Sequence, residues 1–247
     1  MPALIRADSM APIRPVAELL PTGIVMILLS SFVFGLIFGS FLNVIIYRLK
    51  THQNAIFGGS FCPACKTKLK WYDLIPLLSF IFLCGRCRHC HKKISWQYPV
   101  VEILSGLIWV LVFWKVFGVN FSPFGGSPAG GQFLNLLNFF YYILIFSALL
   151  IIAVYDFRWQ IIPDKVVYPA IVVALIYNIL PLDKGGLWEV LLTAAVAFSF
   201  FFSIYFFSNG KAMGLGDAKL AILIGLFLSP IAALTAFVLA FVIGAAF

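Results

Sequence analysis

The sequence predicts an all-α membrane protein, a bundle of about seven transmembrane helices with one long polar loop. Hydrophobic residues make up 63% of the 247 residues and charged residues only 11%, whereas soluble domains hold roughly 45–50% apolar and about 25% charged residues. The mean hydropathy is +1.06, and the chain contains 27 Phe. One soluble core cannot bury that much apolar surface, so the composition excludes a soluble domain.

The apolar segments follow one another along the chain from residue 22. Residues 1–21 read as a polar tail rather than a signal peptide, since no cleavage site follows the first apolar run. Five segments are each about long enough, at roughly 17–25 residues, to cross a bilayer; they are 22–47, 100–117, 134–155, 166–181 and 187–208. The uncharged stretch from Leu220 to the end is too long for one span, so we expect a break at Ser229-Pro230.

Small and polar residues share one face of the first span. Gly35, Gly39 and Asn43 recur every four residues and so lie on one side of a helix. This pattern predicts close packing against another helix. Asn43 then needs a hydrogen-bond partner at membrane depth.

One segment carries the whole net charge of +8. Residues 48–98 hold nine basic residues and one acid, and the rest of the chain holds eight of each. Cytoplasmic loops collect Lys and Arg, so we expect this loop in the cytoplasm and the N-terminus outside. Residues 156–165 and 209–219 then also lie inside, with thirteen Lys and Arg inside against four outside. We expect the basic loop to face lipid headgroups and predict no nucleic-acid partner.

Four cysteines inside that loop form two CxxC pairs, Cys62 with Cys65 and Cys87 with Cys90. This spacing is close to that of a four-thiolate zinc site, in which each CxxC turn presents two sulfurs. We expect a structural zinc, since four thiolates leave no open position for catalysis. An iron centre has the same donor set and stays open as an alternative, while disulfides are disfavoured in a reducing compartment.

Two further features lie close to these pairs. Cys84 precedes Cys87 by three residues and so forms another CxxC. Residues 74–85, between the pairs, are apolar but too few to cross a bilayer, so we expect them to pack on the membrane surface or against the bundle. A metal would tie both ends of this segment together.

Three aspartates flank the predicted spans on the side of the basic loop, where ionisable groups are costly and mark functional sites. Asp164 and Asp217 stand where helices begin and are candidate N-caps, and for Asp164 we expect capping. Asp156 stands at a helix exit, where the helix dipole disfavours a carboxylate, which favours a function. Gly214 and Gly216 would let the backbone approach a substrate strand closely.

Asp156 and Asp217 are a candidate catalytic pair, although 61 residues separate them. Two carboxylates about 3 Å apart share a proton, so one acts as base toward water while the other protonates a carbonyl. This is aspartic peptidase chemistry, which needs no Ser, Cys or His nucleophile. The alternatives are a proton-coupled transporter in which both aspartates relay protons, and a non-catalytic membrane scaffold held by zinc.

The motifs, taken in order, resemble those of type IV prepilin peptidases. In the N-terminal half they are Gly39-Ser40-Phe41-Leu42-Asn43-Val44 with Arg48, Cys62-Pro63-x-Cys65, Trp71-x-Asp73-x-Ile75-Pro76, Gly85-Arg86-Cys87-x-x-Cys90, Ile94-Ser95 and Tyr98-Pro99-x-Val101-Glu102. In the C-terminal half they are Asp156, Ile162-Pro163-Asp164 and Met213-Gly214-x-Gly216-Asp217-x-Lys219-Leu220.

The resemblance implies a GxGD-type aspartic peptidase of the bacterial inner membrane. Such an enzyme removes the leader peptide from type IV prepilins and pseudopilins at the cytoplasmic face. The implied catalytic residues are Asp156 and Asp217, with Asp164, Gly214 and Gly216 as accessory residues.

The resemblance also implies N-methylation of the new N-terminal residue with S-adenosylmethionine. That activity is associated with the zinc loop, and Gly85 matches a glycine linked to it. We therefore divide the chain into the polar tail (1–21), the first helix (22–47), the zinc loop (48–98) and the peptidase bundle (99–247). The family usually has an eighth span, before which this chain ends, and Cys84 departs from the family pattern.

Overall fold

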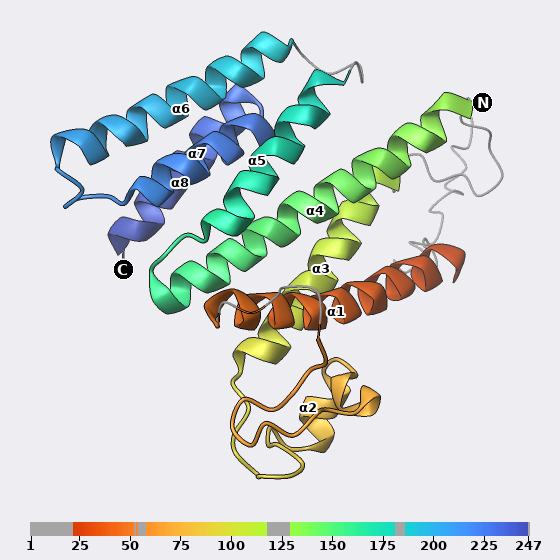
Figure 1. The fold of residues 1–247 in the computed structure, drawn as a ribbon. Helices are drawn as coiled ribbons and strands as arrows, with labels where there is room; N and C mark the ends of the chain where they lie inside the picture. Colours follow the sequence, from red (N-terminus) through yellow and green to blue (C-terminus); the bar gives the residue numbers. More distant parts are fainter. Residues whose placement is uncertain (1–21, 52, 54–57, 118–128, 181–185, 247) are drawn as a thin grey trace, which may run out of the picture.

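The computed structural model describes residues 22–51, 53, 58–117, 129–180 and 186–246, which form helices and their connections (Figure 1). No β-strand occurs in these ranges, where extended backbone forms only two isolated bridges in the polar loop. The all-α fold predicted from the sequence is therefore confirmed. The predicted polar tail of residues 1–21 lies outside the described residues.

Seven apolar helices occur in the described part of the chain. Four are long and apolar enough to cross a membrane: α1 (Thr22–Lys50), α3 (Gln97–Phe117), α4 (Ala129–Trp159) and α6 (Leu187–Phe207). The shorter ones are α5 (Asp164–Ile179), α7 (Leu215–Phe227) and α8 (Pro230–Ala246), with 16, 13 and 17 residues. The uncharged C-terminal stretch breaks as predicted, because α8 begins at Pro230.

The small-residue face predicted on the first span packs against α3. A Cβ on Gly35 or on Gly39 would lie 2.7 Å from a Cα atom of α3. Non-bonded carbons prefer about 3.5–4.0 Å, so only glycine fits at both positions. Asn43 lies on the same face and donates from Nδ2 to the carbonyl of Tyr98 over 3.0 Å. Both expectations for this face are confirmed.

Helices α4 to α7 form the second part of the bundle, in which α5 runs between α4 and α7 (Figure 1). Their shared core contains the buried side chains of Tyr141, Ile145, Ile152, Val167 and Leu223. This order of helices brings the end of α4, the start of α5 and the start of α7 to one end of the bundle.

The outward faces of the helices are apolar, as in a protein solvated by lipid. Exposed apolar side chains on α1 include those of Met26, Leu29, Val33 and Ile37. Their spacing of three and four residues forms one stripe along the helix. Such a stripe is unfavourable in water but is well solvated by hydrocarbon.

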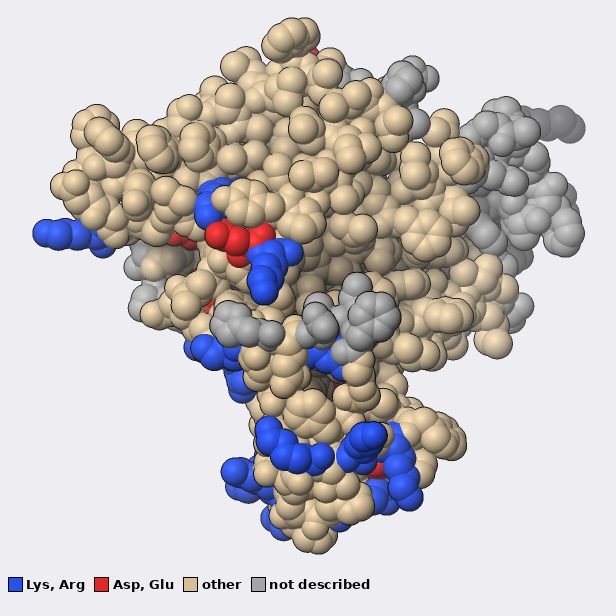
Figure 2. Space-filling model, viewed as in Figure 1, with Lys and Arg blue, Asp and Glu red and all other residues tan. Residues whose placement is uncertain are grey.

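The polar loop between α1 and α3 forms a small unit beyond the ends of these helices (Figure 1). We call residues 58–96 the cysteine loop; it contains η2 (Trp71–Leu74) and the short α2 (Leu78–Phe82). Figure 2 shows Lys and Arg side chains gathered over this unit. Ile81 and Phe82 are 65% and 80% exposed, so contact of this segment with the membrane surface stays a prediction.

Candidate functional site

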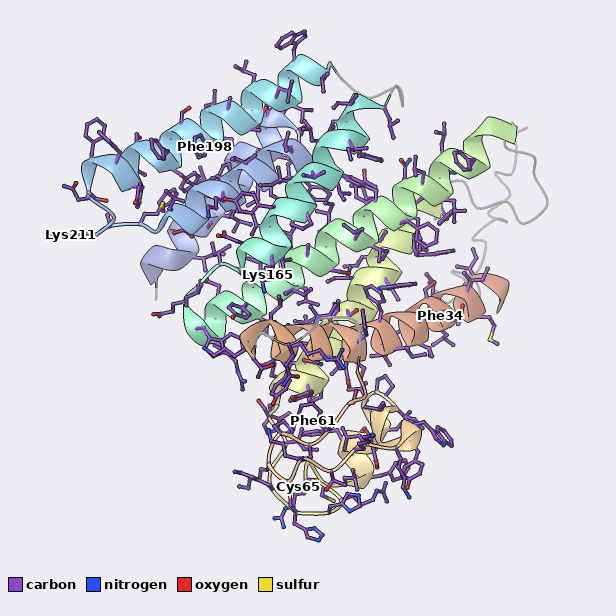
Figure 3. The ribbon with its side chains drawn as sticks, in the orientation of Figure 1. Phe34, Phe61, Cys65, Lys165, Phe198 and Lys211 are labelled. Atoms are coloured by element: carbon purple, nitrogen blue, oxygen red, sulfur yellow. The ribbon has the colours of Figure 1, made fainter. Side chains whose placement is uncertain are left out.

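The four cysteines of the two CxxC pairs come together in the cysteine loop, where Figure 3 labels Cys65. Their sulfurs all lie within 4.8 Å of one another, and the Sγ atoms of Cys62 and Cys90 are 4.0 Å apart. Zn–S bonds of about 2.3 Å place tetrahedral sulfurs about 3.8 Å apart, so spacing and donor type fit such an ion. Cys84 is exposed and lies outside this group. The predicted set of four cysteines is therefore confirmed as a cluster that can hold a metal ion.

Both CxxC pairs are built on the same turn. In the first turn, the N–H of Cys62 donates to the carbonyl of Thr67, and the N–H of Lys66 donates to the carbonyl of Cys62. The second turn repeats both hydrogen bonds around Cys87. An isolated bridge extends each turn. Backbone bonds thus orient two sulfurs from each turn toward a common centre.

Local hydrogen bonds favour the thiolate form of two of these cysteines. The hydroxyl and the backbone N–H of Thr67 lower the pKa of Cys65 to about 6. The backbone N–H groups of Cys90 and His89 lower the pKa of Cys87. The thiolate is the form of cysteine that binds a metal. Burial and the three neighbouring thiols instead raise the pKa of Cys90 to about 11, so the loop favours the thiolate at Cys65 and Cys87 only.

Two of the three predicted site aspartates, Asp156 and Asp217, occupy helix ends at the same end of the bundle. Asp156 is exposed in the last turn of α4, and Asp217 is half-buried in the first turn of α7. Figure 3 labels Lys165 in the first turn of α5 and Lys211 in the connection between α6 and α7. The joint catalytic role of the two aspartates stays a prediction.

Neither Asp164 nor Asp217 is the N-cap residue of its helix. Pro163 is the N-cap of α5 and Gly214 is the N-cap of α7, and neither helix start has a side-chain capping bond. The predicted capping role of Asp164 is therefore wrong, because an N-cap lies outside the helix and Asp164 is already its first residue. Its carboxylate instead accepts a hydrogen bond from Lys219 Nζ over 2.7 Å.

The two glycines before Asp217 have different surroundings. A Cβ on Gly216 would lie 3.0 Å from the Cβ of Ile162, whereas a Cβ on Gly214 would meet the Asp217 carboxylate no closer than 3.6 Å. Gly216 therefore lets the start of α7 pack against the segment that leads into α5. The approach of a substrate strand to these glycines stays a prediction, since the close neighbour of Gly216 is this chain's own Ile162.

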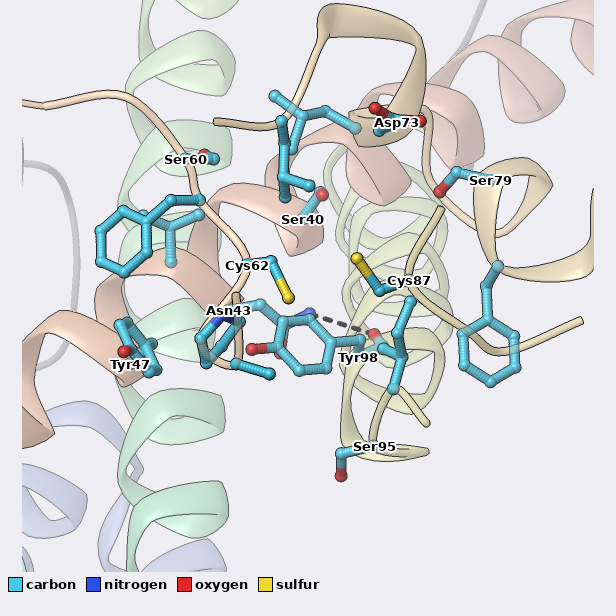
Figure 4. A pocket seen from close by; sticks show the side chains of 18 of the residues that line it. Ser40, Asn43, Tyr47, Ser60, Cys62, Asp73, Ser79, Cys87, Ser95 and Tyr98 are labelled. Carbon is cyan, nitrogen blue, oxygen red and sulfur yellow. Dashed lines mark hydrogen bonds between the residues drawn. The ribbon is translucent and has the colours of Figure 1, made fainter. Parts of the chain in front are cut away.

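A cavity of ≈ 490 Å³ lies between the cysteine loop and the ends of α1, α3 and α4 (Figure 4). Its lining combines charged and aromatic side chains, among them Phe61, Asp73, Phe80, Glu102 and Arg158. Arg158 Nη2 donates to Ser95 Oγ over 2.8 Å, which joins α4 to the cysteine loop. Sequence reasoning did not predict this cavity, although the motifs of the N-terminal half contain many of its lining residues, among them Asp73, Tyr98 and Glu102.

Comparison with known proteins identifies the family. Residues 33–116 match the bacterial peptidase A24 N-terminal domain, and residues 143–247 match the type IV leader peptidase family. A prepilin leader peptidase/N-methyltransferase of Klebsiella pneumoniae is 35% identical over 211 residues, which cover 81% of this chain and 85% of that protein. The chain belongs to the type IV leader peptidase family.

Further relatives carry the same description. The prepilin leader peptidase/N-methyltransferase of Bacillus subtilis is 33% identical, with 87% of this chain and 79% of that protein covered. The one of Vibrio cholerae is 31% identical, with 77% and 73% covered. No solved structure shows a significant match. Membership in the leader peptidase family confirms the prediction that the chain is an enzyme.

The two family matches divide the site residues between them. The A24 N-terminal match contains the four cysteines and every cavity residue except Arg158. The leader peptidase match contains Asp156, Asp164 and Asp217. Arg158 is thus the residue through which the second region reaches the cavity of the first.

Gly85, which the resemblance links to methyl transfer, lies behind the cavity rather than in its lining. Its φ is +66°, and a Cβ there would lie 3.0 Å from Cζ of Phe80. Phe80 itself lines the cavity. A larger residue at position 85 would therefore strain the backbone and displace the Phe80 ring.

Proposed function

We propose that the chain is an aspartic endopeptidase that removes the leader peptide from type IV prepilins and pseudopilins, with Asp156 and Asp217 as its catalytic pair. The observation that carries this proposal is that Asp156 in the last turn of α4 and Asp217 in the first turn of α7 lie at the same end of the bundle, in a chain of the leader peptidase family. The related proteins are named for prepilin leader cleavage, which supports prepilins as substrates.

The chemistry follows from two carboxylates that share one proton. The ionised one takes a proton from water, whose oxygen forms a bond to the scissile carbonyl carbon. The protonated one gives its proton to the carbonyl oxygen, and the C–N bond then breaks as the leaving amine is protonated. We assign Asp164 a positioning role, because its bond to Lys219 connects the start of α5 with the first turns of α7.

The second proposed activity is N-methylation of the amine that cleavage exposes. The names of the relatives support it. When bound, S-adenosylmethionine supplies the methyl group: the neutral amine forms a C–N bond as the C–S bond breaks, leaving S-adenosylhomocysteine and a proton. We propose zinc as the metal for Cys62, Cys65, Cys87 and Cys90, since four thiolates at this spacing suit zinc.

We propose that the enzyme lies in the bacterial inner membrane with the cysteine loop and the aspartates on the cytoplasmic side. The excess of Lys and Arg in the loop supports this orientation. The substrate then presents its basic leader at the inner leaflet, where the catalytic pair lies. The tail (1–21), the first helix (22–47), the zinc loop (48–98) and the peptidase bundle (99–247) remain the proposed divisions.

Cleavage by the purified protein tests this function. The full chain in detergent is incubated with a prepilin, and the wild type is compared with Asp156→Ala, Asp217→Ala and the control Glu189→Ala. We expect each aspartate variant to lose cleavage by roughly a thousandfold or more and the control to retain it.

The alternatives predict different outcomes in the same assay. A proton-coupled transporter or a zinc-held scaffold would not cleave a prepilin at all. Cleavage that survives either aspartate substitution would show that Asp156 and Asp217 are not the pair.

A further inference from the structure

The short helix α2 has two unlike faces. Leu78, Ile81 and Phe82 are 51%, 65% and 80% exposed, and their spacing of three and four residues puts them on one side of the helix. We call these three residues the outward face of α2. Ser79 and Leu83, which lie four residues apart, instead line the cavity. The helix thus presents one face to the cavity and an exposed apolar face to its surroundings.

A hydrogen bond to α3 fixes the depth at which α2 begins. The backbone N–H of Leu77, the N-cap of α2, donates to Oε2 of Glu102 over 2.9 Å. Glu102 lies five residues after Gln97, the first residue of α3, which is about 7.5 Å along the helix axis. With its 21 residues, α3 is about as long as the hydrocarbon core of a bilayer is thick. The start of α2 therefore lies beside the membrane-embedded part of α3, near the end that adjoins the cysteine loop.

The backbone of this segment suits a place in lipid, where an unpaired N–H is costly. Inside α2 the N–H of Ile81 donates to the carbonyl of Leu77 over 2.9 Å. After its last turn, the N–H groups of Leu83 and Cys84 donate to the carbonyls of Ser79 and Ile81 over 3.0 Å each. Together with the bond from Leu77 to α3, these bonds satisfy donors at both ends of α2. The donors can therefore leave water without a loss of hydrogen bonds.

Aromatic and basic side chains of the kind found at membrane surfaces flank α2. Trp96 is 73% exposed directly before α3, and its ring packs on Phe80 of α2 with centroids 5.2 Å apart. Tryptophan is enriched at the level of the lipid headgroups. Lys70 and Arg88 lie over the ring of Tyr72 in the adjoining η2, and Figure 2 shows further cations over the loop. Cations at a membrane surface attract anionic headgroups, which favours a phospholipid leaflet as the occupant of the outward face.

We infer that α2 inserts its outward face into the lipid leaflet on the side of the cysteine loop, and that Glu102 holds the start of the helix at that depth. Amphipathic helices at membrane surfaces bury their apolar face by about 5–10 Å, which agrees with the position of Glu102 along α3. The cysteine loop is then attached to the membrane through α2 as well as through α1 and α3. This insertion depends neither on the compartment that the loop faces nor on the proposed catalytic activities.

Fluorescence quenching in nanodiscs of phosphatidylethanolamine and phosphatidylglycerol tests the insertion on the full chain. A bimane label is attached to Phe82→Cys in a Cys84→Ser background, and to the control Lys68→Cys in the same background. Lys68 is exposed and stands three residues after Cys65, which Figure 3 places toward the end of the loop away from the helices. The signal of labelled Cys84→Ser alone is subtracted. The two quenchers are a lipid with a nitroxide near the headgroup end of its acyl chain, and aqueous iodide.

We expect the nitroxide lipid to quench most of the fluorescence at position 82 and iodide to quench little of it, with the reverse at position 68. Quenching at position 82 by iodide but not by the nitroxide lipid would overturn the insertion. So would protection from iodide that arises only when a prepilin is added, or only when two chains share a disc, because a substrate or a second copy would then cover the outward face.

Substitution of Glu102 tests the bond that sets the depth. In the labelled Phe82→Cys protein, Glu102→Ala should weaken quenching by the nitroxide lipid and strengthen quenching by iodide. Glu102→Gln should retain the original pattern, because its amide oxygen accepts the same bond from Leu77. Metal content and gel filtration show whether both variants are folded. Unchanged quenching in folded Glu102→Ala, or an equal change in both variants, would overturn the role of this bond.

Discussion

At the scale of single residues, the ion pair between Asp164 and Lys219 has the form of a positioning contact. Its side chains are 57% and 17% exposed, and exposed pairs contribute only about 0–1 kcal/mol to stability. The pair nevertheless connects the first residue of α5 with a residue two positions after Asp217. The ion pair therefore serves to position the Asp164 and Asp217 carboxylates and contributes little to the free energy of unfolding.

Removing either partner of this pair should slow cleavage without stopping it. We expect Asp164→Asn and Lys219→Met each to lower kcat about tenfold, because misplacement of catalytic groups by an ångström costs up to ~100-fold. The double variant should be no slower than either single one, since one contact is lost in all three. Cleavage kinetics measure this, with Lys211→Met as a control. Losses that multiply in the double variant would contradict a shared contact.

The two glycines before Asp217 give a second prediction at this scale. Gly216→Ala should destabilise the fold by about 1 kcal/mol through its contact with Ile162, whereas Gly214→Ala should leave stability unchanged because its site has room. Thermal unfolding in detergent measures both. Ile162→Ala should restore part of the lost melting temperature to Gly216→Ala. Equal effects of the two glycine substitutions would refute this explanation.

At the scale of elements, the cysteine loop is a short irregular segment with two matching turns. Its described secondary structure consists of η2, α2 and two isolated bridges. Few of its apolar side chains are buried, and Trp71, Phe82 and Trp96 are all exposed. A unit of this size needs a crosslink to hold its shape. A metal ion held by the four clustered thiols would provide this crosslink.

Elemental analysis of purified protein tests the metal and its ligands. We expect about one zinc per chain in the wild type and in Cys84→Ser, and a loss of most of it in Cys62→Ser and Cys90→Ser, since a structural site needs four ligands. Chelation should expose the loop to proteolysis before the helices. Iron in place of zinc would identify the other metal that the sequence allows, and a zinc loss in Cys84→Ser would contradict the ligand set.

At the scale of the whole molecule, the two halves meet on one side of the bundle. The first half, α1 and α3 with the cysteine loop, packs against α4 of the second, and the bond from Arg158 to Ser95 adds a polar contact. The basic loop, the aspartates and the cavity all lie toward this side. The outward helix faces between the two ends are apolar. The orientation of the protein in the membrane therefore determines which compartment the cysteine loop, the aspartates and the cavity all face.

Labelling with a membrane-impermeant maleimide tests that orientation. Cys84 is exposed and outside the metal cluster, so it should stay unlabelled in intact spheroplasts and react in inside-out vesicles. Glu189→Cys in a Cys84→Ser background should show the opposite pattern, because the start of α6 lies at the other end of the bundle. Labelling of Cys84 from outside would reverse the proposed topology.

The sequence alone determined the features that depend on local pattern. Apolar run lengths located the helices, Ser229-Pro230 marked the break before α8, and the CxxC spacing picked the four cysteines. Gly35 and Gly39 predicted a packing face because their period is that of one helix. Burial in lipid and the geometry of a turn are properties of neighbouring residues, so the sequence reveals them directly.

Only the tertiary structure decided how distant residues combine. It replaced the expected cap at Asp164 with a bond to Lys219, placed Asp156 and Asp217 at the same end of the bundle, and enclosed a cavity lined by Glu102 and Arg158. These contacts join positions that lie tens of residues apart, and they depend on which helix faces pack together. Local hydrophobicity and residue spacing do not determine which helix faces pack together, because that depends on the packing of the whole bundle.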